Sequence, residues 1–164
     1  MTKWQSNFAE QLREWLSSPK RIVVAGIGNL IRSDDSVGVK ITQKLQGKTS
    51  ARINLLECET VPESFIDEIV AFEPTHVLLV DAALMGLKPG EVRLFNTEKI
   101  TDFPAISTHM LPMPVLCKLI AQLTGAKIAL ILIEPKNTEI GEGLTAEVQK
   151  SAEQVVCLLL KLLP

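Results

Sequence analysis

The sequence predicts a doubly wound, three-layer α/β/α sandwich with a mostly parallel five-stranded sheet and one antiparallel edge strand. Short apolar runs that suit buried strands alternate with amphipathic stretches that suit helices along all 164 residues. No internal repeat, low-complexity tract or Gly/Ser-rich linker divides the chain. We therefore expect residues 1–164 to form a single domain around one core.

The N-terminal segment predicts an amphipathic helix that ends before Ser17-Ser18-Pro19. Its large apolar side chains share one helical stripe: Trp4, Phe8, Leu12, Trp15 and Leu16. We expect this stripe to pack against the core. Docking of a partner is the alternative, because both tryptophans of the chain lie in this segment.

Three strands and two helices are expected in the next part of the chain. The strands are predicted at 22–27, 53–56 and 77–80, and the helices at about 35–45 and 62–72. The first and third strands are continuous apolar runs, which indicate central strands buried on both faces. Thr60 and Glu63 have the capping-box spacing that would begin the second helix.

The last part of the chain predicts an edge strand, a helix, a central strand and a final helix. The first three are expected at 91–95, 112–123 and 129–133. A Lys88-Pro89-Gly90 turn leads into the edge strand, and Gly125 follows the first of these helices. Thr145 can cap the final helix, whose stripe consists of Val148, Ala152, Val155, Leu159 and Leu162.

Charge and composition exclude several classes of function. The formal net charge of −2 leaves no broad positive field to attract nucleic acid or an anionic membrane. No segment reaches the roughly 20 apolar residues of a membrane span, and the N-terminus lacks the apolar region of a signal peptide. Cys58, Cys117 and Cys157 lack a CxxC spacing, so we expect three buried thiols. These features predict a cytoplasmic protein without membrane insertion or a nucleic-acid partner.

Polar residues follow the predicted strands at the edge where parallel sheets bind ligands. They are Asp34-Asp35 after the first strand, Asp81 at the end of the third, and Thr108-His109 before the helix at 112–123. If the strand order begins 2-1-3, Asp35 and Asp81 face each other across the crevice. Two carboxylates and the His109 imidazole could then share a divalent transition metal and leave coordination positions open.

Each of these residues also has an ordinary structural explanation. The two aspartates can cap a helix, Asp81 can make a turn, and His109 can bond backbone in a surface loop. Gly26 and Gly28 suggest a dinucleotide-binding loop, but Ile31 occupies the third glycine position of that fingerprint. Spacing alone leaves the metal site and the structural explanation open.

Four stretches of the sequence carry a resemblance to a known family. They are GIGNLIRSDDSVG (26–38), VDAALMGLKPGEVRLF (80–95), STHMLPM (107–113) and IEPKNTEIGEGLT (133–145). Together they resemble the hydrogenase maturation endopeptidases, in particular the type that processes the large subunit of formate-hydrogenlyase-type, hydrogenase 3-like [NiFe] hydrogenases. The resemblance runs from about Ile22 to the C-terminal helix, so residues 1–19 form an extra N-terminal helix.

The resemblance implies a nickel-dependent, aspartic-type endopeptidase that removes the C-terminal extension of the [NiFe] hydrogenase large-subunit precursor. It implies that Asp35, Asp81 and His109 both bind the metal and catalyse the cleavage. It also implies that this metal is nickel supplied by the substrate and that the resting enzyme would hold none. The loop around Gly141 and the stretch Met85-Gly86-Leu87 would line the cleft; the alternative is that the first is a mobile connection and the second a hydrophobic anchor. We also expect a monomer.

The sequence departs from the family pattern at one place, and two other functions are alternatives to this hypothesis. Where the family has an acidic residue and two glycines, this chain has Glu57-Cys58-Glu59-Thr60, so only Glu57 is carried over, as a rim residue. A non-catalytic assembly chaperone would hold the nickel-loaded precursor without shortening it. A nucleotide-binding Rossmann-like protein is the second rival, and the incomplete glycine fingerprint speaks against it.

Overall fold

The computed structural model describes residues 2–99 and 112–164 and contains a five-stranded sheet. The strands are β1 (Ile22–Ile27), β2 (Ile53–Glu59), β3 (His76–Ala82), β4 (Val92–Asn96) and β5 (Lys127–Ile133). Their order is β2-β1-β3-β5-β4, and all neighbours are parallel except β4, which pairs antiparallel with β5 at the edge. The predicted sheet, its antiparallel edge strand and the 2-1-3 start of the strand order are therefore confirmed.

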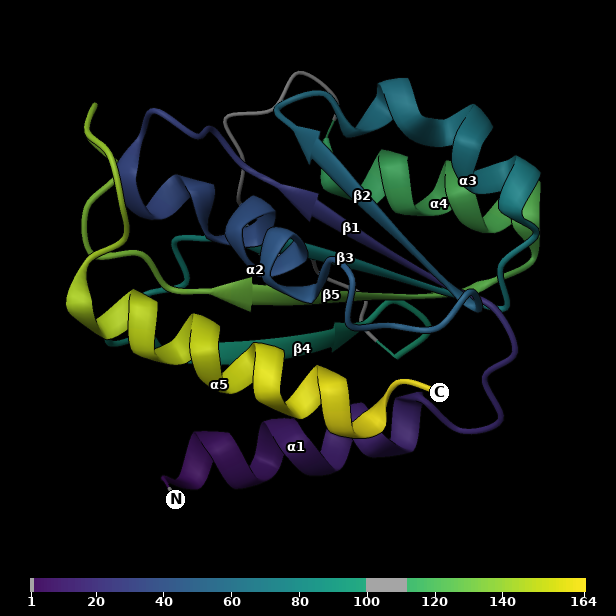
Figure 1. The fold of residues 1–164 in the computed structure, drawn as a ribbon, viewed down its shortest axis with the longest axis horizontal. Helices are drawn as coiled ribbons and strands as arrows, with labels where there is room; N and C mark the ends of the chain where they lie inside the picture. The colour runs from purple at the N-terminus through teal and green to yellow at the C-terminus, as the bar shows by residue number, and fades with distance from the viewer. Residues whose placement is uncertain (1, 100–111) are drawn as a thin grey trace.

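Helices cover both faces of the sheet (Figure 1). The α-helices are α1 (Lys3–Trp15), α2 (Val37–Leu45), α3 (Ile66–Phe72), α4 (Met113–Thr124) and α5 (Ala146–Leu162), with 3₁₀ turns η1 (Ser33–Ser36) and η2 (Pro62–Phe65). One apolar core lies between the sheet and α1, α2 and α5, and a second lies between the sheet and α3 and α4. Every residue of β1 and β3 is buried, as expected for strands covered on both sides.

The stripe of α1 packs into the core, as the sequence predicts. Phe8, Leu12 and Trp15 are buried, and α1 lies against β4. The ring of Trp15 meets that of His76, at the start of β3, edge to face with centroids 5.0 Å apart. The helix is also capped at its N-terminus, because Thr2 and Gln5 form a reciprocal capping box.

Two expectations about helix starts were wrong. The capping box predicted at Thr60 and Glu63 does not form, because the chain enters η2 through Val61 without a side-chain cap. The helix expected from Asp35 begins at Val37, because residues 33–36 form the 3₁₀ turn η1. Asp35 therefore lies in this turn and not in the first turn of an α-helix.

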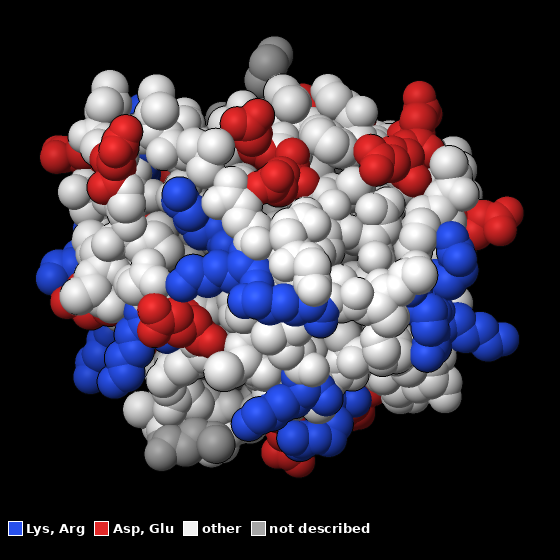
Figure 2. Space-filling model, viewed as in Figure 1, with Lys and Arg blue, Asp and Glu red and all other residues white. Residues whose placement is uncertain are grey.

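The surface seen in Figure 2 mixes both signs of charge. Most acidic side chains on this face lie along the upper part of the view, and most basic side chains lie across its middle and lower parts. Among the described residues, no helix has both the length and the apolar character that crossing a bilayer requires.

Candidate active site

The carboxyl ends of β1, β3 and β5 lie at the same edge of the sheet, because these strands are parallel neighbours. In folds of this kind ligands bind outside this edge, where the winding of the chain reverses. An acidic residue ends or follows each of the three strands: Asp35 in η1, Asp81 near the end of β3, and Glu134 directly after β5.

Asp35 is held close to the end of β1 by an unusually tight backbone approach. A Cβ atom on Gly28 would overlap the carbonyl oxygen of Asp35, so only glycine fits there. The Asp35 carboxylate is half-buried and accepts a hydrogen bond from the backbone N–H of Asn29 at 3.2 Å. The side chain thus has a defined direction at the mouth of the β1 loop.

Asp81 lies in β3, directly beside β1. Its side chain is 1% exposed, and its Oδ1 accepts the N–H of Ala82 at 2.8 Å. The turn η1, which carries Asp35, packs against β3. Gly38, at the start of the adjoining helix α2, lets that helix approach β3 closely, because a Cβ atom there would overlap the Val80 carbonyl. The turn that carries Asp35 and the strand that carries Asp81 are therefore in contact, and the facing of their two carboxylates stays a prediction.

The third residue of the predicted site, His109, lies outside the described residues. Within residues 2–99 and 112–164, no group of three His, Cys, Asp or Glu side chains is close enough together to hold a metal ion. The meeting of Asp35, Asp81 and His109 at one ion therefore stays a prediction. Its donor set of two carboxylates and an imidazole is one that nickel and similar divalent ions accept.

Asp34 has a role that the sequence analysis missed. It is completely buried, and its Oδ2 accepts from the backbone N–H groups of Lys136 and Asn137, at 2.9 and 3.0 Å. Thr145 donates both its N–H and its hydroxyl to the same carboxylate, each at 2.8 Å. Thr145 is the N-cap residue of α5, as expected, but its side chain bonds Asp34 and not the helix. Asp34 therefore fixes the loop after β5 beside the Asp35 turn.

Glu134 fixes the loop after β3 in the same way. Its Oε1 accepts the backbone N–H groups of Met85 and Leu87, at 2.7 and 3.0 Å, and the side chain is buried. An acidic residue directly after a buried apolar strand is the signal that also marks Asp81, so the pattern could have suggested Glu134. Its two partners lie nearly 50 residues earlier in the chain, so no local sequence pattern indicates these hydrogen bonds.

The other polar candidates have less defined positions. Glu57 is exposed on β2, in register with Gly26 of β1, so it lies near the same edge.

Two of the three cysteines, Cys58 and Cys117, are buried as expected. Burial raises the pKa of each thiol to about 12, and Glu68 and Glu63 add to the effect at Cys58. The expectation for Cys157 was wrong, because it is exposed on α5.

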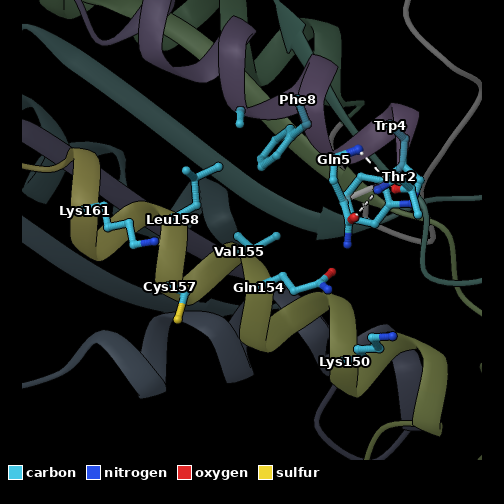
Figure 3. Close-up of a pocket in the computed structure, with 11 residues that line it drawn as sticks. Thr2, Trp4, Gln5, Phe8, Lys150, Gln154, Val155, Cys157, Leu158 and Lys161 are labelled. Atoms are coloured by element: carbon cyan, nitrogen blue, oxygen red, sulfur yellow. Dashed lines mark hydrogen bonds between the residues drawn. The ribbon is translucent and has the colours of Figure 1, made fainter.

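A groove of about 650 Å³ lies between α1 and α5, away from these acidic residues (Figure 3). Phe8 of α1 points toward α5 there, and Lys150, Cys157 and Lys161 of α5 also line the groove. The lining contains neither Asp35 nor Asp81 and no other carboxylate. The groove therefore lacks the carboxylates and the imidazole on which the predicted chemistry depends, and the sheet edge is the better candidate for a catalytic site.

Fold and site together define a doubly wound α/β protein with an acidic site at the carboxyl edge of its sheet. A family model described as hydrogenase maturation protease matches residues 39–162, a range that includes Asp81 and His109 but begins after Asp35. A putative hydrogenase maturation protease of Methanocaldococcus jannaschii is 32% identical over 94% of this chain and 95% of its own length. The hydrogenase 3 maturation protease of Escherichia coli is 26% identical over 81% of this chain and 85% of its own.

A solved structure agrees with these sequence matches. The crystal structure of the [NiFe] hydrogenase maturation protease HycI from Thermococcus kodakarensis superposes with a TM-score of 0.85 at 33% identity. The superposition covers 93% of this chain and 98% of that one. The chain belongs to the hydrogenase maturation protease family.

Proposed function

We propose that this protein is the endopeptidase that removes the C-terminal extension from the nickel-containing large-subunit precursor of a [NiFe] hydrogenase. Family membership supports a protease of hydrogenase maturation. The observation that carries the site assignment is the packing of the Asp35 turn against β3, which holds the buried Asp81. This packing brings two acidic residues to the edge of the sheet where such folds bind ligands.

In this proposal Asp35, Asp81 and His109 together contact the nickel ion that the precursor already carries. The ion is part of the substrate and not a resident cofactor of the enzyme. Two carboxylate oxygens and an imidazole nitrogen are suitable donors for nickel, and they leave positions for the ligands that the precursor provides.

The chemistry we propose is hydrolysis of one peptide bond beside that ion. Asp35 or Asp81 accepts a proton from a water molecule while the water oxygen attacks the carbonyl carbon of the bond. The nickel polarises the carbonyl oxygen, and collapse of the tetrahedral intermediate breaks the C–N bond. The carboxylic acid returns its proton to the leaving amine, so the carboxylate is regenerated.

This arrangement makes cleavage depend on the loading of the precursor. A precursor without nickel offers no cation to Asp35, Asp81 and His109, so it binds them less favourably than the loaded form. The proposal extends to the setting of the enzyme: residues 1–164 act as one peptidase domain and as a monomer in the cytoplasm. Free cysteines among the described residues suit a reducing compartment.

The direct test is to incubate the protein with purified precursor, with and without nickel, and to measure the intact mass of the product. Wild-type protein should shorten only the nickel-loaded precursor. Asp81→Asn and His109→Ala should abolish cleavage while keeping a wild-type circular dichroism spectrum. Asp67→Ala, an exposed aspartate on α3, is the matched control and should cleave normally.

Two results would contradict the proposal. Full processing by both Asp81→Asn and His109→Ala would remove these residues from the reaction. A tight complex with loaded precursor but no shortened product, even for the wild type, would favour the assembly chaperone.

A further inference from the structure

Three large aliphatic side chains near the candidate site are exposed to solvent. Ile31 is 61% exposed, Leu84 70% and Ile140 80%. They lie on the loops that follow β1, β3 and β5, the same loops that surround Asp35 and Asp81. A single exposed aliphatic residue is ordinary, but several on the loops of one site indicate a surface that a partner covers.

Backbone hydrogen bonds hold Ile31 and Ile140 next to each other. Gly141 donates its N–H to the Ile31 carbonyl at 2.9 Å, and its own carbonyl accepts the Ser33 N–H at 2.9 Å. Figure 1 shows the loop after β5 running alongside the turn that precedes α2. The buried Asp34 adds four further hydrogen bonds between the same two loops. These bonds fix the backbone on which the exposed Ile31 and Ile140 side chains are carried.

Leu84 is presented by a loop that is fixed on both sides. Before it, Ala83 donates its N–H to the Ile133 carbonyl at 2.9 Å. After it, Met85 and Leu87 donate to the buried carboxylate of Glu134. The exposure of Leu84 thus results from a defined backbone and not from a loose chain end.

We propose that Ile31, Leu84 and Ile140 bind apolar side chains of the precursor on either side of the cleaved peptide bond. This inference rests on the proposed function and goes beyond it, because it assigns substrate selection to residues outside the acidic site. The loops that carry these three side chains follow the strands that end at the edge where Asp35 and Asp81 lie, so an extended polypeptide bound at this edge can contact them. Apolar substrate side chains then bury the exposed aliphatic surface, which favours binding.

The test compares Ile31→Ser, Leu84→Ser and Ile140→Ser with wild type in two measurements on nickel-loaded precursor. The first is the rate of cleavage as a function of precursor concentration, and the second is a binding titration. We expect each substitution to raise KM and Kd about tenfold, the size expected for one lost apolar contact, with kcat within about twofold. Leu123→Ser, an exposed aliphatic at the far end of α4, is the matched control and should change neither.

Replacing the apolar residues that flank the cleaved bond by serine in the precursor should give the same rise in KM. These substitutions should not add to the effect of Ile140→Ser if the two side chains meet. Unchanged KM and Kd for all three protein variants would overturn the inference and leave the protease assignment intact. A wild type that binds but does not cleave, with weaker binding by the variants, would overturn the protease assignment and keep this surface. Dissociation of a dimer by the substitutions, with unchanged Kd for precursor, would also overturn the inference.

Discussion

Replacing Asp34 by asparagine tests how strongly one buried carboxylate holds the loops around the site. The carboxylate accepts four hydrogen bonds, three at Oδ2 and one at Oδ1. In its best orientation the asparagine oxygen keeps the three bonds of Oδ2, and its amide nitrogen then faces the N–H of Thr145. The part-buried Thr145 N–H is left without an acceptor and meets another donor, the asparagine NH2 group, and the three remaining charge-assisted bonds become neutral.

The expected cost follows from these losses. An unpaired buried N–H costs about 1–3 kcal/mol, and each bond that loses its charge loses about 1 kcal/mol. The amide no longer requires the burial of a charge, which offsets part of this cost. We therefore expect Asp34→Asn to lower the free energy of unfolding by about 2–4 kcal/mol.

Urea unfolding followed by tryptophan fluorescence measures this change, because Trp4 and Trp15 both lie in α1, away from the site. Glu139→Gln, an exposed acidic residue in the same loop, is the control and should change stability by less than about 0.5 kcal/mol. If Asp34→Asn is no less stable than this control, Asp34 does not hold the loops as described.

Two further predictions follow from the buried groups. The exposed Cys157 should react with a thiol reagent at pH 8 in the folded protein. Cys58 and Cys117 are buried and have pKa values of about 12, so they should react only after unfolding. Three fast-reacting thiols in the native protein would contradict this. Burial, with the nearby Lys127, lowers the pKa of His76, so its contribution to stability is present above about pH 6.5 and lost as pH falls below it. The loss has a slope of at most about 1.4 kcal/mol per pH unit, and His76→Asn should show a smaller slope between pH 7.5 and 5. Equal slopes for the two proteins would show that His76 titrates as it does in the unfolded chain.

The central strands could be predicted because a strand buried on both faces consists of consecutive apolar residues. Residues 22–27 and 77–80 are apolar without a break, and both form central strands. The ends were less accurate: β5 begins at Lys127, two residues before the predicted start at 129, because sheet hydrogen bonds do not require an apolar side chain. Helix starts were least accurate, since the 3₁₀ turn at Ser33–Ser36 depends on packing against other strands.

The site was only partly predictable from the sequence, for a related reason. Asp35 and Asp81 could be proposed because parallel strands place their carboxyl ends together. The role of Asp34 could not be inferred, because its partners Lys136, Asn137 and Thr145 lie more than 100 residues further along the chain. Such loop-to-loop bonds have no local pattern and emerge only when the sheet has brought the loops together.

The central claim is that Asp35, Asp81 and His109 meet at a single ion. Anomalous diffraction at the nickel edge, from crystals of this protein soaked with nickel, tests it most directly. We predict one strong peak at the carboxyl edge of the sheet, roughly 2 Å from a carboxylate oxygen of each aspartate and from an imidazole nitrogen of His109. A peak bound elsewhere, or one that touches only one of the three side chains, would contradict the claim.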